Sequence, residues 1–233
     1  ITHNPELIIS AYFPHIIPID LIELPTLGSV NIHPGLLPFY RGKFPTPWYI
    51  LNGSPTFGIA IHRLDSGVDT GDVLLQAEYQ LPGDITGHAL YRLTMDLGAS
   101  LLIENLDNLL AGTLEGKRQT GIGSYFNSIE PRWQIDWNLS LTAIERRVRV
   151  HAKPFLPAYT FAFNRIIFVN RVLPTLIDGY GAQGGGKIIA LNDDDSFIVS
   201  CSDGCLKIVD YEVYPPFNGA EKTYHLRVGD KLG

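Results

Sequence analysis

The first half of the chain alternates strand-like apolar runs with one long amphipathic helix. The strands are predicted at residues 7–12, 28–33, 56–64 and 73–81. An apolar period near 3.6 predicts a helix over 88–110, with Thr86 as its N-cap and Gly112 near its end. Short helical turns are expected at 19–24 and 47–51. This order is typical of the α/β class, and we expect a Rossmann-like sheet.

The second half has a different pattern. Residues 117–135 lack a period and indicate a linker, and a short helix is expected at 141–151. Brief β-rich runs follow at 159–163, 165–172, 187–191, 197–201 and 205–213. Short strands separated by regular turns favour a small barrel or sandwich, so we expect a β-rich, OB-like domain. The predicted domains are therefore 1–127 and 128–233.

The first predicted strand indicates that other strands of the same sheet precede it. Residues 6–10 have the continuous apolar character of a buried parallel strand, and such a strand needs neighbours on both sides. The chain also begins at Ile1 rather than at Met. We therefore expect a fragment whose sheet has earlier strands in a longer protein.

Composition and charge narrow the class of protein. With 45% hydrophobic and 18% charged residues, the chain is typical of soluble globular proteins, and no apolar run is long enough for a bilayer span. A cytoplasmic protein without a membrane partner is expected. Residues 1–127 carry 6 basic against 12 acidic side chains, and residues 128–233 carry 12 of each. Neither half has the basic surplus that favours a nucleic-acid backbone.

The two cysteines, Cys201 and Cys205, flank an Asp-Gly turn signal. A disulfide there would close a very small loop. Two free thiols are the expected state, and the flanking sequence does not complete a zinc ligand set.

Asn31 and His33 stand where a predicted strand opens into a loop. The two-residue period of a strand places both on one face, and ligands of open parallel sheets lie at the carboxyl ends of strands. An amide beside an imidazole is suited to stabilising an oxyanion. An isolated Asn-x-His is more often a cap and a core histidine, so the surrounding sequence decides between these interpretations.

That surrounding sequence is distinctive. His33 is followed by Pro-Gly-Leu-Leu-Pro-Phe-Tyr-Arg-Gly at 34–42, and His-Arg-Leu-Asp-Ser-Gly-Val-Asp-Thr-Gly-Asp stands at 62–72. This ordered set resembles the folate-dependent formyltransferase family, which includes methionyl-tRNA, glycinamide ribonucleotide and sugar-nucleotide N-formyltransferases. The Ile-Asp-Trp at 135–137 resembles the start of that family's C-terminal domain.

The resemblance implies a catalytic triad of Asn31, His33 and Asp69, with 10-formyltetrahydrofolate as the formyl donor. Asn31 and protonated His33 hold the oxyanion while the acceptor amine attacks the formyl carbon. Asp69 orients His33, raises its pKa and helps to remove the amine proton through water. Without the other two residues, Asp69 reads as a turn residue between glycines.

The resemblance also implies binding residues. The pterin slot is lined by Tyr12, Phe13, Ile16 and Ile17, with Asp65 and Gly67 on its opposite side, although ordinary core is an equal reading for the isoleucines. On the loop after the triad, Tyr40 and Arg41 are expected at the acceptor. For Arg41, anchoring a substrate phosphate and bracing the loop remain open alternatives.

Several alternatives remain for the chemistry. A metal site built from His33, His62 and Asp69 has no recognised ligand spacing, and the family uses no metal. The preferred acceptor is an amino sugar attached to a nucleotide, and methionyl-tRNA is the alternative acceptor. Two less favoured functions are hydrolysis of the formylfolate and a non-catalytic binding role. The C-terminal domain is expected to form a homodimer or cap the site.

Overall fold

The computed structural model describes residues 5–175, 177, 184–214 and 226–233. The chain forms two compact units. The N-terminal unit contains Ile1–Gly83 and Ala89–Ile129, and the C-terminal unit contains Asp84–His88 and Glu130–Gly233.

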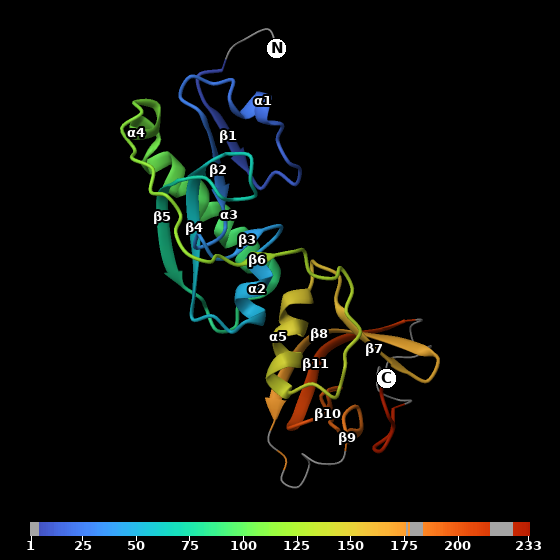
Figure 1. The fold of residues 1–233 in the computed structure, drawn as a ribbon. Coiled ribbons are helices and arrows are strands. Elements are labelled where there is room, and N and C mark those ends of the chain that lie inside the picture. The colour runs from blue at the N-terminus through green and yellow to red at the C-terminus, as the bar shows by residue number, and fades with distance from the viewer. Residues whose placement is uncertain (1–4, 176, 178–183, 215–225) are drawn as a thin grey trace. The chain divides into compact units, whose positions relative to one another are not determined.

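A four-stranded mixed sheet forms the centre of the N-terminal unit (Figure 1). Its strands, in the spatial order β1-β2-β4-β5, are Ile8–Ala11, Ser29–His33, Thr56–Arg63 and Val73–Gln80. β1 and β2 are parallel, whereas β4 is antiparallel to both of its neighbours. Each strand lies within two residues of its predicted range, and the mixed sheet fits the expected α/β class.

Helix α3 (Gly87–Glu104) packs its apolar side chains on this sheet. Its leucines, including Leu97 and Leu101, lie against a core that contains Val30, Ile32, Ile59 and Ile61. A Cβ atom at Gly98 would stand 2.8 Å from the Ile32 side chain, so this glycine lets the helix approach the sheet closely.

The prediction of one helix over 88–110 was wrong at Asn105. There α3 has ended, and a separate helix α4 runs over Leu106–Leu110. The Asn105 backbone is outside the helical region at φ −118°, and its side-chain amide donates to the Leu101 carbonyl (2.9 Å). A side chain that hydrogen-bonds to the backbone in this way competes with the helix and ends it.

Two short helices and a two-stranded sheet complete this unit. The helices are α1 (Ile19–Ile22) and α2 (Thr46–Leu51). Strands β3 (Arg41–Gly42) and β6 (Tyr125–Phe126) pair in parallel, although 84 positions separate them. Neither was predicted, because β3 lies in the expected loop and β6 in the expected linker. The pairing ties the end of this unit to the loop that follows β2.

The C-terminal unit has a five-stranded antiparallel sheet and one helix, α5 (Leu141–His151). In the spatial order β7-β8-β11-β10-β9, the strands are Ala158–Ala162, Arg165–Thr175, Gly204–Tyr214, Phe197–Cys201 and Ile188–Leu191. Ser140 caps α5, since its hydroxyl accepts a hydrogen bond from the Ala143 amide (3.2 Å). The predicted helix and β-rich runs are all present.

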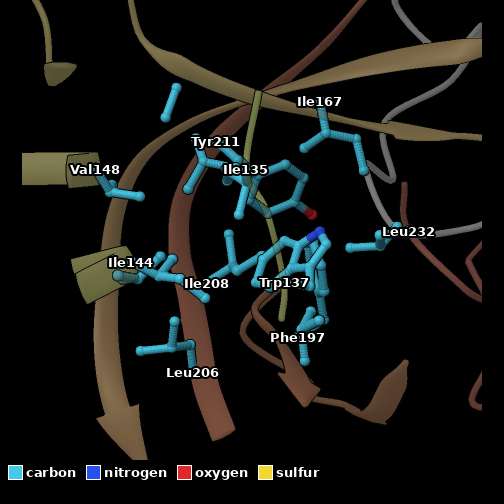
Figure 2. Close-up of a cluster of buried hydrophobic side chains, with 14 of the residues drawn as sticks. Ile135, Trp137, Ile144, Val148, Ile167, Phe197, Leu206, Ile208, Tyr211 and Leu232 are labelled. Carbon is cyan, nitrogen blue, oxygen red and sulfur yellow. The ribbon is translucent and has the colours of Figure 1, made fainter. Parts of the chain in front are cut away.

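Apolar side chains from α5 and the sheet point toward one another in this unit (Figure 2). Trp137 lies among them, and its indole N–H donates to the Thr160 hydroxyl (3.0 Å), so its only polar atom is satisfied. Cys201 and Cys205 are both buried as thiols and are not joined in a disulfide, as expected. Burial raises the pKa of the Cys201 thiol to about 11, which makes it unreactive as a nucleophile.

Candidate active site

Strand register brings the polar side chains of the site together. Asn31 of β2 is the direct cross-strand partner of His62 of β4, although 31 positions separate them. Side chains of such a pair lie on the same face, and His33 shares that face because it is two residues from Asn31. Asp69 follows β4 in a turn that returns to this face.

The four side chains are close to one another. Asp69 lies 3.6 Å from His33 (Oδ2 to Nδ1) and 3.4 Å from His62 (Oδ1 to Nε2). The Asn31 amide nitrogen is 3.3 Å from Nε2 of His62. The His33 and His62 side chains are only 4% and 1% exposed, whereas Asp69 is 12% exposed and Asn31 is half-buried. The structure therefore brings together the three predicted triad residues and adds His62.

Backbone carbonyls assign the imidazole tautomers. Nε2 of His33 is 2.7 Å from the Tyr40 carbonyl, and Nδ1 of His62 is 2.8 Å from the Arg63 carbonyl. A carbonyl oxygen only accepts, so each of these nitrogens carries a hydrogen. Neutral His62 then accepts from Asn31 through Nε2, while a protonated His62 would instead donate to Asp69. Neutral His33 presents a bare Nδ1 to Asp69.

Two features of the backbone hold this arrangement. A Cβ atom at Gly35 would stand 2.6 Å from Nε2 of His33 and 2.8 Å from the Tyr40 carbonyl, so glycine there makes room for the imidazole. Asp69 has a left-handed backbone at φ 55°, which costs a non-glycine residue about 1–2 kcal/mol. The Gly42 amide donates to Oδ2 of Asp69 (2.8 Å) and helps to hold that conformation.

Burial dominates the pKa of His33. Loss of solvent lowers the pKa of the imidazole, and the nearby charge of Asp69 opposes this only in part, so the pKa lies below its ordinary value of 6.5. The charge of Asp69 does raise this pKa, as expected, but burial outweighs it, so the expectation of a protonated His33 was wrong. His33 is consequently neutral at pH 7.

The pKa of Asp69 is also lowered. Burial favours the protonated acid, but the hydrogen bond that His62 donates when it is protonated, the positive charge that His33 carries in its protonated form and the Gly42 N–H together outweigh it. Asp69 is therefore a carboxylate at neutral pH, next to two imidazoles.

The residues expected around the pterin slot differ in their surroundings. Phe13 and Ile16 are 55% and 85% exposed, and Ile17 is half-buried. Tyr12 packs edge-on against Tyr91 (5.5 Å between ring centroids), and burial raises the pKa of its phenol. Exposed apolar side chains of this kind are available to a flat ring, and their contact with folate stays a prediction.

Asp65 and Gly67 shape the turn that carries Asp69. Oδ1 of Asp65 accepts from the Gly67 amide (3.0 Å) and from the Thr70 hydroxyl (2.7 Å), which is an Asx-turn. A Cβ atom at Gly67 would collide with that Thr70 hydroxyl. Both residues thus have a structural role, and a folate contact stays a prediction for them too.

The Tyr40 ring stacks on Tyr49 with 3.8 Å between centroids. The Arg41 guanidinium donates to Gln119 Oε1 from Nε (3.0 Å) and Nη2 (2.5 Å). It also donates to the Tyr125 hydroxyl from Nη1 (3.1 Å). Arg41 therefore braces the loop, and its contact with a substrate phosphate stays a prediction.

Sequence reasoning missed three contributors to the site. His62 was weighed only as a metal ligand, although its position on the strand beside Asn31 was a usable signal. The Gly42 amide and the Gln119 side chain gave no signal, because one is a backbone group and the other lies in a segment without a period. Across the described ranges, no group of three His, Cys, Asp or Glu side chains has an arrangement suited to a metal ion.

Two cavities, of about 500 and 340 Å³, are lined by residues of the C-terminal unit. None of Asn31, His33, His62 and Asp69 lines either of them. A ligand can therefore reach this group of four side chains only where Asn31 and Asp69 are partly exposed.

Comparison with known proteins identifies the family. A model described as formyl transferase matches residues 2–106, and one described as formyl transferase, C-terminal domain, matches residues 131–214. A methionyl-tRNA formyltransferase of Ruminiclostridium cellulolyticum is 34% identical over 239 residues, which cover 99% of this chain and 75% of that protein. The chain belongs to the formyl transferase family. The resemblance predicted from the motifs, and the fold class that it implied, are confirmed.

This formyltransferase shares its fold with formyltransferases of known structure. The N-formyltransferase of Helicobacter canadensis, in complex with folinic acid and dTDP-3-aminofucose, has a TM-score of 0.68 at 23% identity. The match covers 85% of this chain and 71% of that one, and it shows the shared fold. PseJ of Anoxybacillus kamchatkensis is 31% identical, with a TM-score of 0.50, over 54% of this chain and 66% of its own. Among the described helices of this formyltransferase, none has the length and apolar character needed to cross a bilayer.

Proposed function

We propose that this enzyme transfers the formyl group of 10-formyltetrahydrofolate to the amine of a nucleotide-linked amino sugar. The observation that carries the proposal is the meeting of Asn31, His33 and Asp69 at the end of β2. Relatives of known structure support the donor, because one was solved with folinic acid and another with tetrahydrofolate.

Asn31 is the donor that we assign to the oxyanion. One N–H of its amide is directed to Nε2 of His62, and this hydrogen bond orients the amide group. The second N–H then has a fixed direction from which to meet the formyl oxygen. A preorganised donor of this kind stabilises the negative charge that develops on that oxygen.

His33 and Asp69 are the pair that we assign to the proton. The amine nitrogen bonds to the formyl carbon, the bond from that carbon to N10 of the folate breaks, and the proton lost by the amine ends on N10. Neutral His33 and the Asp69 carboxylate present two acceptors 3.6 Å apart, which can hold this proton in transit. The imidazolium that forms lies beside Asp69 and adds positive charge near the oxyanion.

The exposed apolar segment after β1 fits a donor with a flat ring. Phe13 and Ile16 expose hydrophobic surface just after β1, an edge strand that is itself partly exposed. Burial of such side chains against a pterin ring would remove apolar area from water, at about 25 cal/mol for each Å². Phe13, Ile16, Ile17 and Tyr12 are the residues that we assign to this contact.

The charge of the second half supports a small acceptor. Residues 128–233 carry 12 basic and 12 acidic side chains, so they provide no basic surplus for a tRNA backbone. The Helicobacter canadensis relative was solved with dTDP-3-aminofucose, an amino sugar of the proposed class.

Methionyl-tRNA is the second candidate acceptor. Two relatives favour it, since the Ruminiclostridium cellulolyticum and Citrifermentans bemidjiense methionyl-tRNA formyltransferases are each 34% identical to this chain.

The test is a competition among acceptors. The protein is incubated with 10-formyltetrahydrofolate and either dTDP-3-aminofucose, methionyl-tRNA or water alone, and the release of tetrahydrofolate is followed. Mass spectrometry then locates the formyl group on the acceptor. We expect formylation of the amino sugar at a rate well above the other two. A fast reaction with methionyl-tRNA alone would replace the proposed acceptor, and release of tetrahydrofolate in water alone would make the enzyme a hydrolase.

A further inference from the structure

Gln119 is attached to the turn that carries Asp69. Its side-chain nitrogen donates to the Asp69 carbonyl (2.9 Å) and to the Gly71 carbonyl (2.7 Å). A primary amide has two N–H groups, and both are used here. One side chain therefore binds the backbone carbonyls on both sides of Thr70, the first of which belongs to Asp69.

The oxygen of the same amide has a different partner. Oε1 of Gln119 accepts two hydrogen bonds from Arg41, at 3.0 and 2.5 Å. A guanidinium only donates and a carbonyl only accepts, so the orientation of the amide is fixed by its neighbours. Arg41 is held in turn by the Tyr125 hydroxyl (3.1 Å).

These contacts act on a strained residue. Asp69 has φ 55°, a conformation that a residue with a side chain seldom keeps without support. The Gly42 amide holds its carboxylate (2.8 Å), and Gln119 holds its backbone. If the turn relaxed to a negative φ, the carboxylate would move away from His33.

We propose that Gln119 is a positioning residue that holds the Asp69 carboxylate against His33 by fixing the backbone of the turn. It acts through Asp69 and contacts no reacting atom. The expected effect of Gln119 on the reaction rate rests on the proposed function. Its effect on the position of Asp69 is independent of any substrate.

Two substitutions separate the hydrogen bonds that Gln119 donates to the turn from those that it accepts from Arg41. Gln119→Leu removes all four hydrogen bonds without adding charge. Gln119→Glu keeps the size and the acceptor for Arg41, but places an oxygen where the two carbonyls need a donor. Gln76→Leu, on the exposed side of β5, is the matched control. If the leucine variant does not fold, the glutamate variant carries the test.

The kinetic readout is the separation of kcat from KM. We expect kcat to fall on the order of 10- to 100-fold in both Gln119 variants, while KM for 10-formyltetrahydrofolate changes less than about twofold. Gln76→Leu should match the parent protein. A Gln119→Glu enzyme with the parent kcat would show that Gln119 serves only Arg41, and it would overturn the assignment.

The second readout needs no substrate. The imidazole of His33 is titrated by NMR in the parent protein, in Gln119→Leu and in Asp69→Asn. The last variant shows the full effect of losing the carboxylate. The groups that face His33 are Asp69, His62 and the Tyr40 carbonyl. We expect both variants to titrate at lower pH than the parent, because the imidazolium loses its nearest negative charge.

The NMR outcome distinguishes the two proposals. A shift in Asp69→Asn with none in Gln119→Leu would overturn the positioning role, whatever the enzyme does with folate. A parent protein that transfers no formyl group would end the proposed function, whereas the expected shift in Gln119→Leu would still support the positioning role.

Discussion

His33 is enclosed by protein groups at both ring nitrogens. Nε2 donates to the Tyr40 carbonyl, and Nδ1 faces Asp69. Because burial keeps the ring neutral, its charge changes only when a proton arrives from the reaction or from acid. A group with this protonation behaviour is suited to taking a proton from an incoming amine and giving it up again.

The Asn31 amide tests the oxyanion assignment. We expect Asn31→Ala to lower kcat by about 10²–10³-fold, the usual cost of removing one oxyanion donor, about 3–4 kcal/mol. The measurement is the steady-state rate of tetrahydrofolate release. Asn127→Ala, on an exposed residue after β6, is the control and should keep the parent rate. A loss below threefold in Asn31→Ala would remove the amide from the mechanism.

The pKa of His33 gives stability a pH dependence. Since the pKa is lower in the folded chain than its ordinary 6.5, the unfolded chain takes up a proton first as the pH falls. The free energy of unfolding then decreases below pH 6.5, by up to about 1.4 kcal/mol per pH unit, until the folded pKa is passed. We expect His33→Gln to have a shallower slope below pH 6.5 in urea unfolding.

The control for that slope is His15→Gln. His15 is exposed and lies in the loop after β1, so its loss should leave the slope of the parent protein. Equal slopes in the parent and in His33→Gln would mean that the folded state does not hold His33 neutral.

At the scale of elements, the β2 and β4 pairing decides which side chains meet. A shift of one residue in this antiparallel register would send His62 to the opposite face and leave Asn31 without its partner. The loop after β2 then has to return close to His33, and Gly35 permits that return.

Gly35 is a test of this loop. A Cβ atom there would lie 2.6 Å from the His33 ring and 2.8 Å from the Tyr40 carbonyl, so Gly35→Ala must displace one of them. We expect a loss of about 1–3 kcal/mol in the free energy of unfolding, together with a large fall in kcat. Gly83→Ala is the control, since a Cβ atom at Gly83 meets nothing within 4 Å. Parent-like activity in Gly35→Ala would show that the loop adapts without moving His33.

The N-cap of α5 offers a second test at this scale. Ser140→Ala removes the hydroxyl that accepts from the Ala143 amide, and we expect it to cost about 1 kcal/mol of unfolding free energy. Ser202→Ala, on an exposed turn residue, should cost much less. Urea denaturation followed by tryptophan fluorescence measures both, because Trp133 and Trp137 lie in the same core. Equal losses would assign the effect to something other than the cap.

The elements that the sequence predicted well have a strong apolar period or clear end signals. β10 and α5 are examples, and their predicted ranges match the observed ones. Two-residue strands such as β3 and β6 are too short to show an apolar period in the sequence. The break at Asn105 depended on a side chain competing with the backbone, and the pKa of His33 depended on burial, which motif spacing does not report.

At the scale of the whole molecule, the two units have separate cores with no member in common. Leu206 is fully buried in β11, the central strand of the second sheet. We expect Leu206→Ala to cost about 2–5 kcal/mol and to speed amide exchange in β8, β10 and β11. Exchange in β2 and β4 should stay unchanged, as measured by mass spectrometry.

The matched control is Leu191→Ala, which truncates a leucine that is 37% exposed on the edge strand β9. Its effect on exchange should be small. If Leu206→Ala accelerated exchange in β2 as much as in β11, the two cores would unfold as one cooperative body.

The pairing of β3 with β6 has a practical consequence for chimeric enzymes. The first family model ends at residue 106, which makes that position an attractive junction for grafting a foreign second domain. Such a graft would discard Tyr125 and Phe126, the strand partners of Arg41 and Gly42, together with Gln119. A chimera cut after Ile129 keeps these residues with the loop that follows β2, so engineers who exchange the C-terminal unit should place the junction there.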